Sequence, residues 1–214
     1  MAHLAKDPAM IESFLTGEDI HSSTARKVFN IKDDPSSDQR RAAKAINFGL
    51  IYGISAYGLA KQLKIDNVEA KGIIDTYFAK YKRVKEFMEE LKELASKQEY
   101  VETMHGRKVF LPNISHSNFQ VRSAAERTAI NAPIQGTAAD IIKIAMINIK
   151  EWLIRENIHN VFMIMQVHDE LVFEIEDSDI HRYGDKISDL MGSAEKLSVP
   201  LLVNTFSGSN WQET

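Results

Sequence analysis

The chain has 214 residues, of which 44% are hydrophobic and 26% charged, with a net charge of −4 and no cysteine. This length supplies material for one or two packed cores, and the net charge excludes a uniformly basic surface, so nucleic acid would have to be bound by local patches. The lack of cysteine excludes disulfides, thiolate metal sites and cysteine nucleophiles. No signal peptide and no apolar run of membrane-spanning length is visible, so we expect a cytoplasmic protein without membrane contact.

The N-terminal region predicts short helices separated by a break. Residues 1–15 should form two helical pieces interrupted at Asp7-Pro8. Residues 17–30 should form a helix that begins at Asp19, with His21 in its first turn. A single histidine in this position is commonly structural or solvated. The inward residues of this helix are expected to be Ala25, Val28 and Phe29.

Residues 40–53 (R-R-A-A-K-A-I-N-F-G-L-I-Y-G) predict a helix capped by Ser36, Ser37 or Asp38. At about 100° per residue, one stripe roughly 60° wide contains Arg40, Lys44, Asn47 and Ile51. Phe48 and Tyr52 lie at the edge of this stripe. Cations beside rings suit a phosphate chain attached to a flat base, because Arg and Lys bind phosphate and rings stack on bases. The residues alone are also compatible with an amphipathic helix whose rings are in the core and whose cations are solvated.

The middle of the chain predicts further helices and one hairpin, which we place at residues 55–63, 67–81 and 84–98 for the helices and 100–104 with 108–111 for the strands. Residues 117–131 should form a helix that Pro133 ends, and Gly136 should loosen the next start. A second, largely buried helix is expected at residues 137–156.

The C-terminal region predicts a helix at residues 179–191 and strands at residues 160–166, 170–175 and 201–206. Helices followed by an antiparallel set indicate the α+β class. The first two strands flank His168-Asp169, so the Asp169 carboxylate should lie at a hairpin tip. Apolar residues on both sides would hold this hard oxygen ligand in place for Mg²⁺. Because neighbouring strand residues point to opposite faces, we expect Asp169 to be the direct metal ligand and Glu170 a helper.

A third candidate set repeats every four residues and consists of Arg127, Asn131 and Gln135. All three side chains donate hydrogen bonds and suit the minor groove, where every base pair offers acceptors in similar positions. Pro133 is expected to prevent one continuous helix through them. Capping and internal hydrogen bonds around this break are the alternative interpretation.

The motifs R-x3-K-x7-Y-G with N-F-G inside it (residues 40–53), Q-V-H-D-E-L-V (residues 166–172) and D-I-H (residues 19–21) resemble the family A DNA polymerases, the DNA polymerase I type. The resemblance covers essentially the whole chain. It implies a helical fingers subdomain at residues 1–113, with a short palm-derived helix at its N-terminus and a hairpin at about 100–111. Residues 114–214 would be part of an antiparallel palm.

The resemblance also implies template-directed DNA synthesis, in which a primer 3′-hydroxyl attacks a dNTP held with two Mg²⁺ ions. The implied dNTP-binding residues are His21, Arg40, Lys44, Phe48 and Tyr52. The implied catalytic residues are Asp169, Glu170 and Lys44, with Asp169 as metal ligand. The implied contacts to primer–template DNA are Tyr52, Gly53, Arg127, Asn131, Gln135 and His168. The ridge of residues 40–52 and Asp169 should then face each other across one cleft.

The family segment D-Y-S-Q-I-E-L-R, which carries the other metal-binding Asp, is expected just before residue 1. Without it and without a thumb, the isolated chain should have no or trace polymerase activity. Two alternatives stay open: a non-catalytic nucleotide- or DNA-binding module, and a metal-dependent phosphohydrolase built on His168-Asp169. We expect a cytoplasmic, nucleoid-associated protein that is monomeric at full length, while this chain could self-associate through an exposed strand edge.

Overall fold

The computed structural model describes residues 1–213, which form two compact units divided between Gly136 and Thr137. From the sequence we expected this division between residues 113 and 114. Unit 1 contains α1 (Ala2–Ala5), α2 (Pro8–Leu15), α3 (Ile20–Val28), α4 (Ser37–Ile51), α5 (Ala56–Leu63), α6 (Asn67–Lys80), α7 (Lys82–Gln98), β1 (Tyr100–Glu102), β2 (Lys108–Phe110) and the first half of α8 (Phe119–Arg155). Unit 2 contains the rest of α8, β3 (Val161–Val167), β4 (Glu170–Ile175), α9 (Ile180–Gly192) and the 3-10 turns Asp177–Asp179 and Trp211–Glu213.

Helices α2 to α6 of unit 1 each begin where the sequence supplies a capping side chain. Asp7 accepts a hydrogen bond from the Met10 amide at the start of α2, and Asp19 accepts one from the His21 amide at the start of α3. Ser36 and Gln39 form a reciprocal capping box before α4. These local hydrogen bonds satisfy amides that the helices leave unpaired, and they confirm the predicted helix starts.

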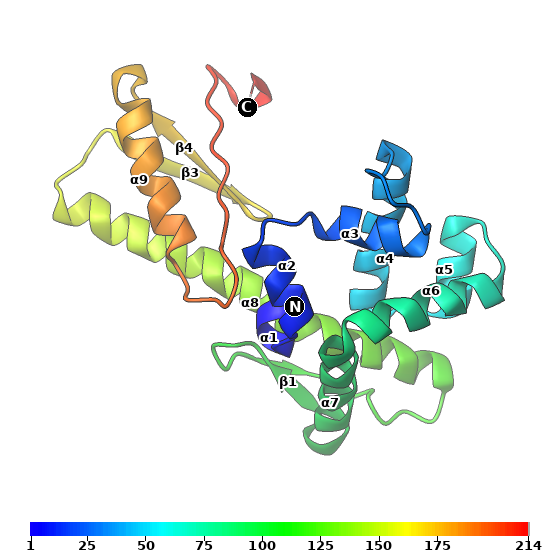
Figure 1. Cartoon of the computed structure of the whole chain (residues 1–214). Helices are drawn as coiled ribbons and strands as arrows, with labels where there is room; N and C mark the ends of the chain where they lie inside the picture. Colours follow the sequence, from blue (N-terminus) through cyan, green and yellow to red (C-terminus); the bar gives the residue numbers. More distant parts are fainter. Residues whose placement is uncertain (214) are drawn as a thin grey trace. The chain divides into compact units, whose positions relative to one another are not determined.

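The core of unit 1 lies where α7 meets the first half of α8 and the β1–β2 hairpin (Figure 1). β1 and β2 are antiparallel, with Val101 opposite Val109. A hairpin of this size is marginal alone, and Val101 is fully buried against the helices, so packing stabilises it. The buried members of this core are Leu91, Ala95, Val101, Leu111, Ile114, Ala125 and Ala129.

Helix α8 is continuous from Phe119 to Arg155 and contains Pro133, so the predicted break is wrong (Figure 1). An interior proline costs about 3 kcal/mol in helix formation. The helix buries apolar residues on both sides of it, including Ile130 and Ile142, and this packing offsets the cost. Gly136 does not loosen a helix start. It gives the hairpin room, because a Cβ there would lie 2.5 Å from Thr103 Cγ2 and the Gly136 carbonyl accepts a hydrogen bond from Arg107.

Unit 2 packs the β3–β4 hairpin and α9 against the second half of α8. Its core combines Ile149, Trp152, Leu153, Val161, Tyr183 and Ile187. The strands pair antiparallel from Val161–Ile175 to Val167–Glu170, with an irregularity between Met163 and Met165. This bulge shifts the alternation of β3, so that residues before and after it pair in a different phase.

Three sequence expectations differ from the structure. Residues 201–206 form no strand, because no other strand of the described chain pairs with them. Phe29 is 37% exposed, at the end of α3, although Ala25 is buried as expected. The second half of α8 is only partly buried, and Ile147 and Ile154 are exposed.

Within residues 1–213, no helix is long and apolar enough to cross a membrane.

Candidate nucleotide-binding site

Helices α3 and α4 pack together in unit 1 and gather cations and rings into one group, here called the α3–α4 cluster: His21, Arg40, Lys44, Phe48 and Tyr52. The His21 and Phe48 ring centroids are 5.7 Å apart, and the rings of Phe48 and Tyr52 stack at 6.2 Å. The Lys44 ammonium lies 5.8 Å from the centre of the Phe48 ring. The side chains that the sequence grouped on one helix therefore lie together, and His21 joins them from α3.

Asn47 is the buried polar residue beneath this cluster and is only 2% exposed. Its carbonyl oxygen accepts a hydrogen bond from Thr24 at 2.9 Å, and its amide nitrogen lies 2.9 Å from Nδ1 of His21. The same nitrogen donates to the Ile20 carbonyl at 3.4 Å. Sequence reasoning placed Asn47 on the polar stripe but missed these contacts, because both partners lie about 25 residues away on α3. The sequence could have indicated that Asn47 is buried, because Asn47 lies one helical turn after Ala43, which faces the core.

Asp19 and Arg40 form an ion pair at the edge of the cluster. Burial opposes ionisation of Asp19, but hydrogen bonds from Arg40, the His21 amide and Ser22 outweigh it and lower the pKa of Asp19 to about 2. Asp19 therefore remains a carboxylate at any ordinary pH. Asp19 holds Arg40 near the first turn of α3, and Asp19 also caps this helix.

His21 is kept neutral by its surroundings. Burial lowers its pKa, the positive charges of Arg40 and Lys44 lower it further, and Asp19 partly opposes them. A neutral imidazole carries one N–H donor and one lone pair. The cluster thus combines two permanent cations with one neutral hydrogen-bonding ring.

The end of α4 is fixed by a Schellman motif. The Gly53 amide donates to the Leu50 carbonyl at 3.0 Å, and the Ile54 amide donates to the Gly49 carbonyl at 2.8 Å. Gly53 has a φ of +74°, a backbone conformation that residues other than glycine rarely adopt. A Cβ at Gly53 would also lie 3.3 Å from the Arg127 side chain. Gly53 therefore lets α4 end directly against α8.

Arg127, Asn131 and Gln135 lie on the continuous helix α8, where residues four apart are about 40° apart around the axis. They form one stripe, contrary to the expected interruption. Arg127 is exposed and donates to Ser123 at 3.0 Å, and Gln135 is exposed. The Asn131 side-chain oxygen is buried without a hydrogen-bond partner in residues 1–213. The stripe adjoins Gly53 through Arg127.

In unit 2, His168 and Asp169 form the two-residue turn between β3 and β4, as predicted. His168 has a φ of +53°, and its carbonyl accepts a hydrogen bond from Gln166. The alternate residues of β4 that begin with Leu171 pack into the core, so Glu170 points to the opposite face. Asp169 and Glu170 are both exposed.

These two carboxylates match the donor type that Mg²⁺ prefers, and their exposure leaves their oxygens accessible. Within the described residues, no group of three or more His, Asp or Glu side chains is arranged to hold a metal ion. The chemistry of Asp169 and Glu170 therefore fits partial coordination of a hard cation, with the remaining ligands coming from water or substrate oxygens.

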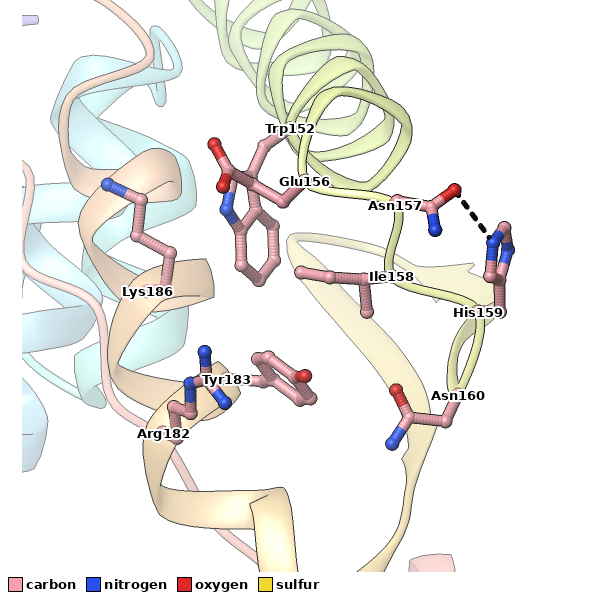
Figure 2. Close-up of a pocket in the computed structure, with 9 residues that line it drawn as sticks. All are labelled: Trp152, Glu156, Asn157, Ile158, His159, Asn160, Arg182, Tyr183 and Lys186. Atoms are coloured by element: carbon pink, nitrogen blue, oxygen red, sulfur yellow. Dashed lines mark hydrogen bonds between the residues drawn. The ribbon is translucent and has the colours of Figure 1, made fainter.

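Unit 2 also contains a pocket of about 410 Å³ between the end of α8 and α9 (Figure 2). Trp152 and Tyr183 form its apolar wall, with ring centroids 5.9 Å apart, and Arg182 lies over the Tyr183 ring. Glu156 and Lys186 add charges of both signs, and His159 adds an imidazole ring. None of the site residues expected from the sequence lines this pocket, and its mixed charges select no class of ligand.

The chain belongs to DNA polymerase family A, whose family model matches residues 1–213.

Individual relatives support this family assignment. DNA polymerase I of Pseudomonas aeruginosa is 50% identical over 214 residues, which is 100% of this chain and 23% of the relative. The enzyme of Streptococcus pneumoniae is 45% identical over 215 residues, 100% of this chain and 24% of the relative. The chain thus spans about a quarter of the length of the curated relatives it matches.

Among solved structures, the chain resembles the POL domain of Pol1 from M. smegmatis in complex with DNA primer-template and dNTP. The TM-score is 0.88 at 44% identity, and the match covers 94% of this chain and 35% of that one. The α+β fold with a helical fingers unit and part of a palm is thereby confirmed.

Proposed function

We propose that this chain binds a deoxynucleoside triphosphate at the α3–α4 cluster and contributes to template-directed DNA synthesis, the transfer of a nucleotide from dNTP to a primer 3′-hydroxyl. The observation that carries the proposal is the gathering of two cations, a neutral histidine and two stacked rings on two packed helices. The related POL domain was captured with primer-template and dNTP, which supports the same ligands here.

The roles of the cluster residues follow from their chemistry. The Arg40 guanidinium can bind phosphate oxygens through two parallel hydrogen bonds, and the Lys44 ammonium neutralises the charge that develops on the departing pyrophosphate. Phe48 offers its ring to the sugar and base, and Tyr52 stacks at the templating position. His21 adds a hydrogen bond to the triphosphate. A nucleotide bound here contacts charge at one end and rings at the other.

We propose that primer–template DNA lies along the stripe of Arg127, Asn131 and Gln135. Gly53 joins this stripe to Tyr52, and His168 contributes from the hairpin tip. The exposed Arg127 and Gln135 side chains can donate hydrogen bonds to base edges in the minor groove, where readout is nearly independent of sequence. Asn131 lies between them on the stripe, is partly exposed, and would use its amide NH₂ group as the donor. A polymerase that copies any template requires such readout.

We also propose that Asp169 is a direct ligand of Mg²⁺ and that Glu170 assists it. Asp169 would ligate Mg²⁺ through its exposed carboxylate at the hairpin tip. When bound, a pair of such ions stabilises the attacking and leaving oxygens of the transferred phosphoryl group. That the α3–α4 cluster faces Asp169 across one cleft remains a prediction.

Nucleotide binding tests the proposal directly. A fluorescent dNTP is titrated into the 214-residue chain, wild type and Arg40→Ala. Loss of a charge-assisted hydrogen bond pair should weaken binding about tenfold or more. Arg41→Ala is the matched control, because Arg41 is on the same helix, its side chain is 81% exposed, and it pairs with Asp38 rather than with a residue of the cluster. Equal affinity of wild type and Arg40→Ala would show that the cluster is not the nucleotide site.

The same titration with labelled primer–template, wild type and Arg40→Ala, tests the alternative of a non-catalytic nucleotide- or DNA-binding module. Equal affinity of the two chains for primer–template would show that α4 does not contact it. No observation in the structure favours the phosphohydrolase alternative. Phosphatase activity that survives Arg40→Ala but is lost in Asp169→Ala would establish it.

Location and assembly are part of the proposal. We place the protein in the cytoplasm at the nucleoid, with the full-length enzyme a monomer. The 214-residue chain exposes Phe162 and Ile164 on β3, so it should self-associate through this strand. Sedimentation at increasing concentration measures this, and a chain that stays monomeric at high concentration would contradict it.

A further inference from the structure

The hydrogen bonds of Asn47 determine which way its amide group is turned. The Ile20 backbone carbonyl can only accept a hydrogen bond, so the side-chain atom facing it must be the amide nitrogen. The amide oxygen then faces Thr24, whose hydroxyl donates to it at 2.9 Å. Asn47 is fully enclosed, with 2% exposure, so water does not offer it other partners.

This orientation determines the protonation pattern of His21. The Asn47 amide nitrogen, which is a donor, lies 2.9 Å from Nδ1 of the imidazole. Nδ1 must therefore supply a lone pair, and in a neutral ring the single proton then resides on Nε2. Burial and the nearby positive charges of Arg40 and Lys44 lower the pKa of His21, which keeps the ring neutral near pH 7.

We propose that Asn47 is a positioning residue that fixes His21 in the tautomer with its proton on Nε2, so that His21 presents a neutral N–H donor to a triphosphate bound by Arg40 and Lys44. This inference rests on the nucleotide-binding function proposed above. Its physical advantage is that a neutral donor adds a hydrogen bond without the desolvation cost of a third positive charge. The centre of the Phe48 ring lies 5.7 Å from that of the imidazole, with the two rings tilted by 49°.

The charged groups around His21 come from several elements. Asp19 precedes it on the same helix, and Arg40 and Lys44 face it from α4. From α6, Lys80 donates to Ser23 on α3. Among these groups, only Asp19 favours the protonated ring. A carboxylate placed at the Asn47 amide position would add a second such group and would require a proton on Nδ1.

The test is ¹⁵N NMR of the histidine rings in the whole 214-residue chain, with His21→Gln to assign the His21 signals. We expect wild-type His21 to show a single tautomer, with protonated Nε2 and unprotonated Nδ1, and a pKa below 6.5. Asn47→Asp, which is nearly the same size and still accepts from Thr24, should move the proton to Nδ1 and raise the pKa of His21. Asn113→Asp adds the same charge at an exposed position and should change neither.

The second readout is the affinity for labelled dNTP. At a pH at which the His21 ring stays neutral, Asn47→Asp should weaken binding about tenfold, because a proton on Nδ1 leaves Nε2 without the hydrogen that it donates to phosphate. His21→Phe keeps a ring but has no N–H group, so it should weaken binding by a similar factor. A wild-type ring protonated on Nδ1, or an even mixture of tautomers, would overturn the proposal. So would full affinity in Asn47→Asp once its tautomer has changed.

Two further outcomes keep the test decisive. If Asn47→Asp does not fold, the wild-type spectrum still decides the tautomer, and Asn47→Ala, which removes the donor to Nδ1, should mix the two tautomers. An unmixed ring in Asn47→Ala would contradict the positioning role. Failure of the function itself looks different: Arg40→Ala would bind dNTP as wild type does, whatever the tautomer of His21.

Discussion

The α3–α4 cluster of unit 1 and the hairpin tip of unit 2 carry the two halves of the proposed chemistry, and they are built differently. In the cluster, each functional side chain has a partner in its own unit: Asn47 contacts His21, Asp19 pairs with Arg40, and Phe48 stacks on Tyr52. At the tip, Asp169 and Glu170 are exposed, and neither makes a side-chain hydrogen bond or ion pair within residues 1–213.

The contrast shows that the cluster is preorganised and the hairpin tip is not. Side chains held by their own unit lose little freedom when a ligand binds, so the cluster should bind nucleotide with most of its ordering cost already met by folding. Exposed carboxylates at a turn must be ordered by the cation itself. Unit 1 should therefore show ligand affinity by itself, whereas chemistry at unit 2 should require further ligands for the metal.

The largest expected effect concerns catalysis. In a primer-extension assay with Mg²⁺, the 214-residue chain should show no or only trace extension compared with a POL domain. Two close divalent cations need several carboxylates, and among residues 1–213 no third acid or histidine joins Asp169 and Glu170. Turnover near that of the POL domain would show that the tip is sufficient and would remove the contrast between the two units.

The next effect concerns the stability of unit 1. Asn47→Ala should lower the free energy of unfolding by about 2–4 kcal/mol, because it leaves the buried Thr24 hydroxyl without its acceptor and opens a cavity. Urea unfolding measures the loss. Asn113→Ala, at an exposed position, should change it by less than about 0.5 kcal/mol. Similar small losses in both would mean that the network beneath the cluster is not a structural support.

The features that the sequence predicted well depend on local interactions. The capping residues Asp7, Asp19 and Ser36 act within three residues of themselves, and the hairpin tip at Asp169 follows from alternation on both sides. The grouping of Arg40, Lys44 and Phe48 needs only helical periodicity. Such patterns are visible before any tertiary contact is known.

The failures depend on partners distant in sequence. Pro133 was expected to end a helix by its local chemistry, but burial of Ile130 and Ile142 on either side keeps α8 intact. Residues 201–206 have strand-like alternation, yet a strand exists only with a hydrogen-bonded neighbour. The role of Asn47 required knowing that α3 packs on α4. No periodicity in one segment contains that information.

A smaller effect should come from the ion pair between Asp19 and Arg40. Asp19→Asn keeps a good helix cap but removes the carboxylate that competes with phosphate for Arg40, so dNTP affinity should rise about two- to fivefold. The same fluorescence titration measures it. Asp38→Asn is the control, because Asp38 pairs with Arg41 on the same helix and should not alter affinity. Weaker binding in Asp19→Asn would instead show that Asp19 orients Arg40 for its ligand.

The smallest effect is the pH dependence that the cluster adds to stability. The pKa of His21 is lowered by burial, so between this value and 6.5 the unfolded chain binds more protons than the folded one. The stability that the neutral ring contributes is therefore lost as the pH falls below 6.5. Asp19, with its pKa lowered to about 2, adds a second loss only below pH 3.8.

Urea midpoints at pH 7.5 and 5.0 separate the two contributions, since Asp19, with its pKa lowered to about 2, stays ionised throughout that interval. The wild type should lose more stability than His21→Gln over this range, and the difference isolates the His21 imidazole from the other histidines, which are common to both chains. An equal loss would mean that the His21 ring takes up its proton as freely in the folded chain as in the unfolded one. The preorganised character assigned to unit 1 would then rest on Asn47 and Asp19 without the imidazole between them.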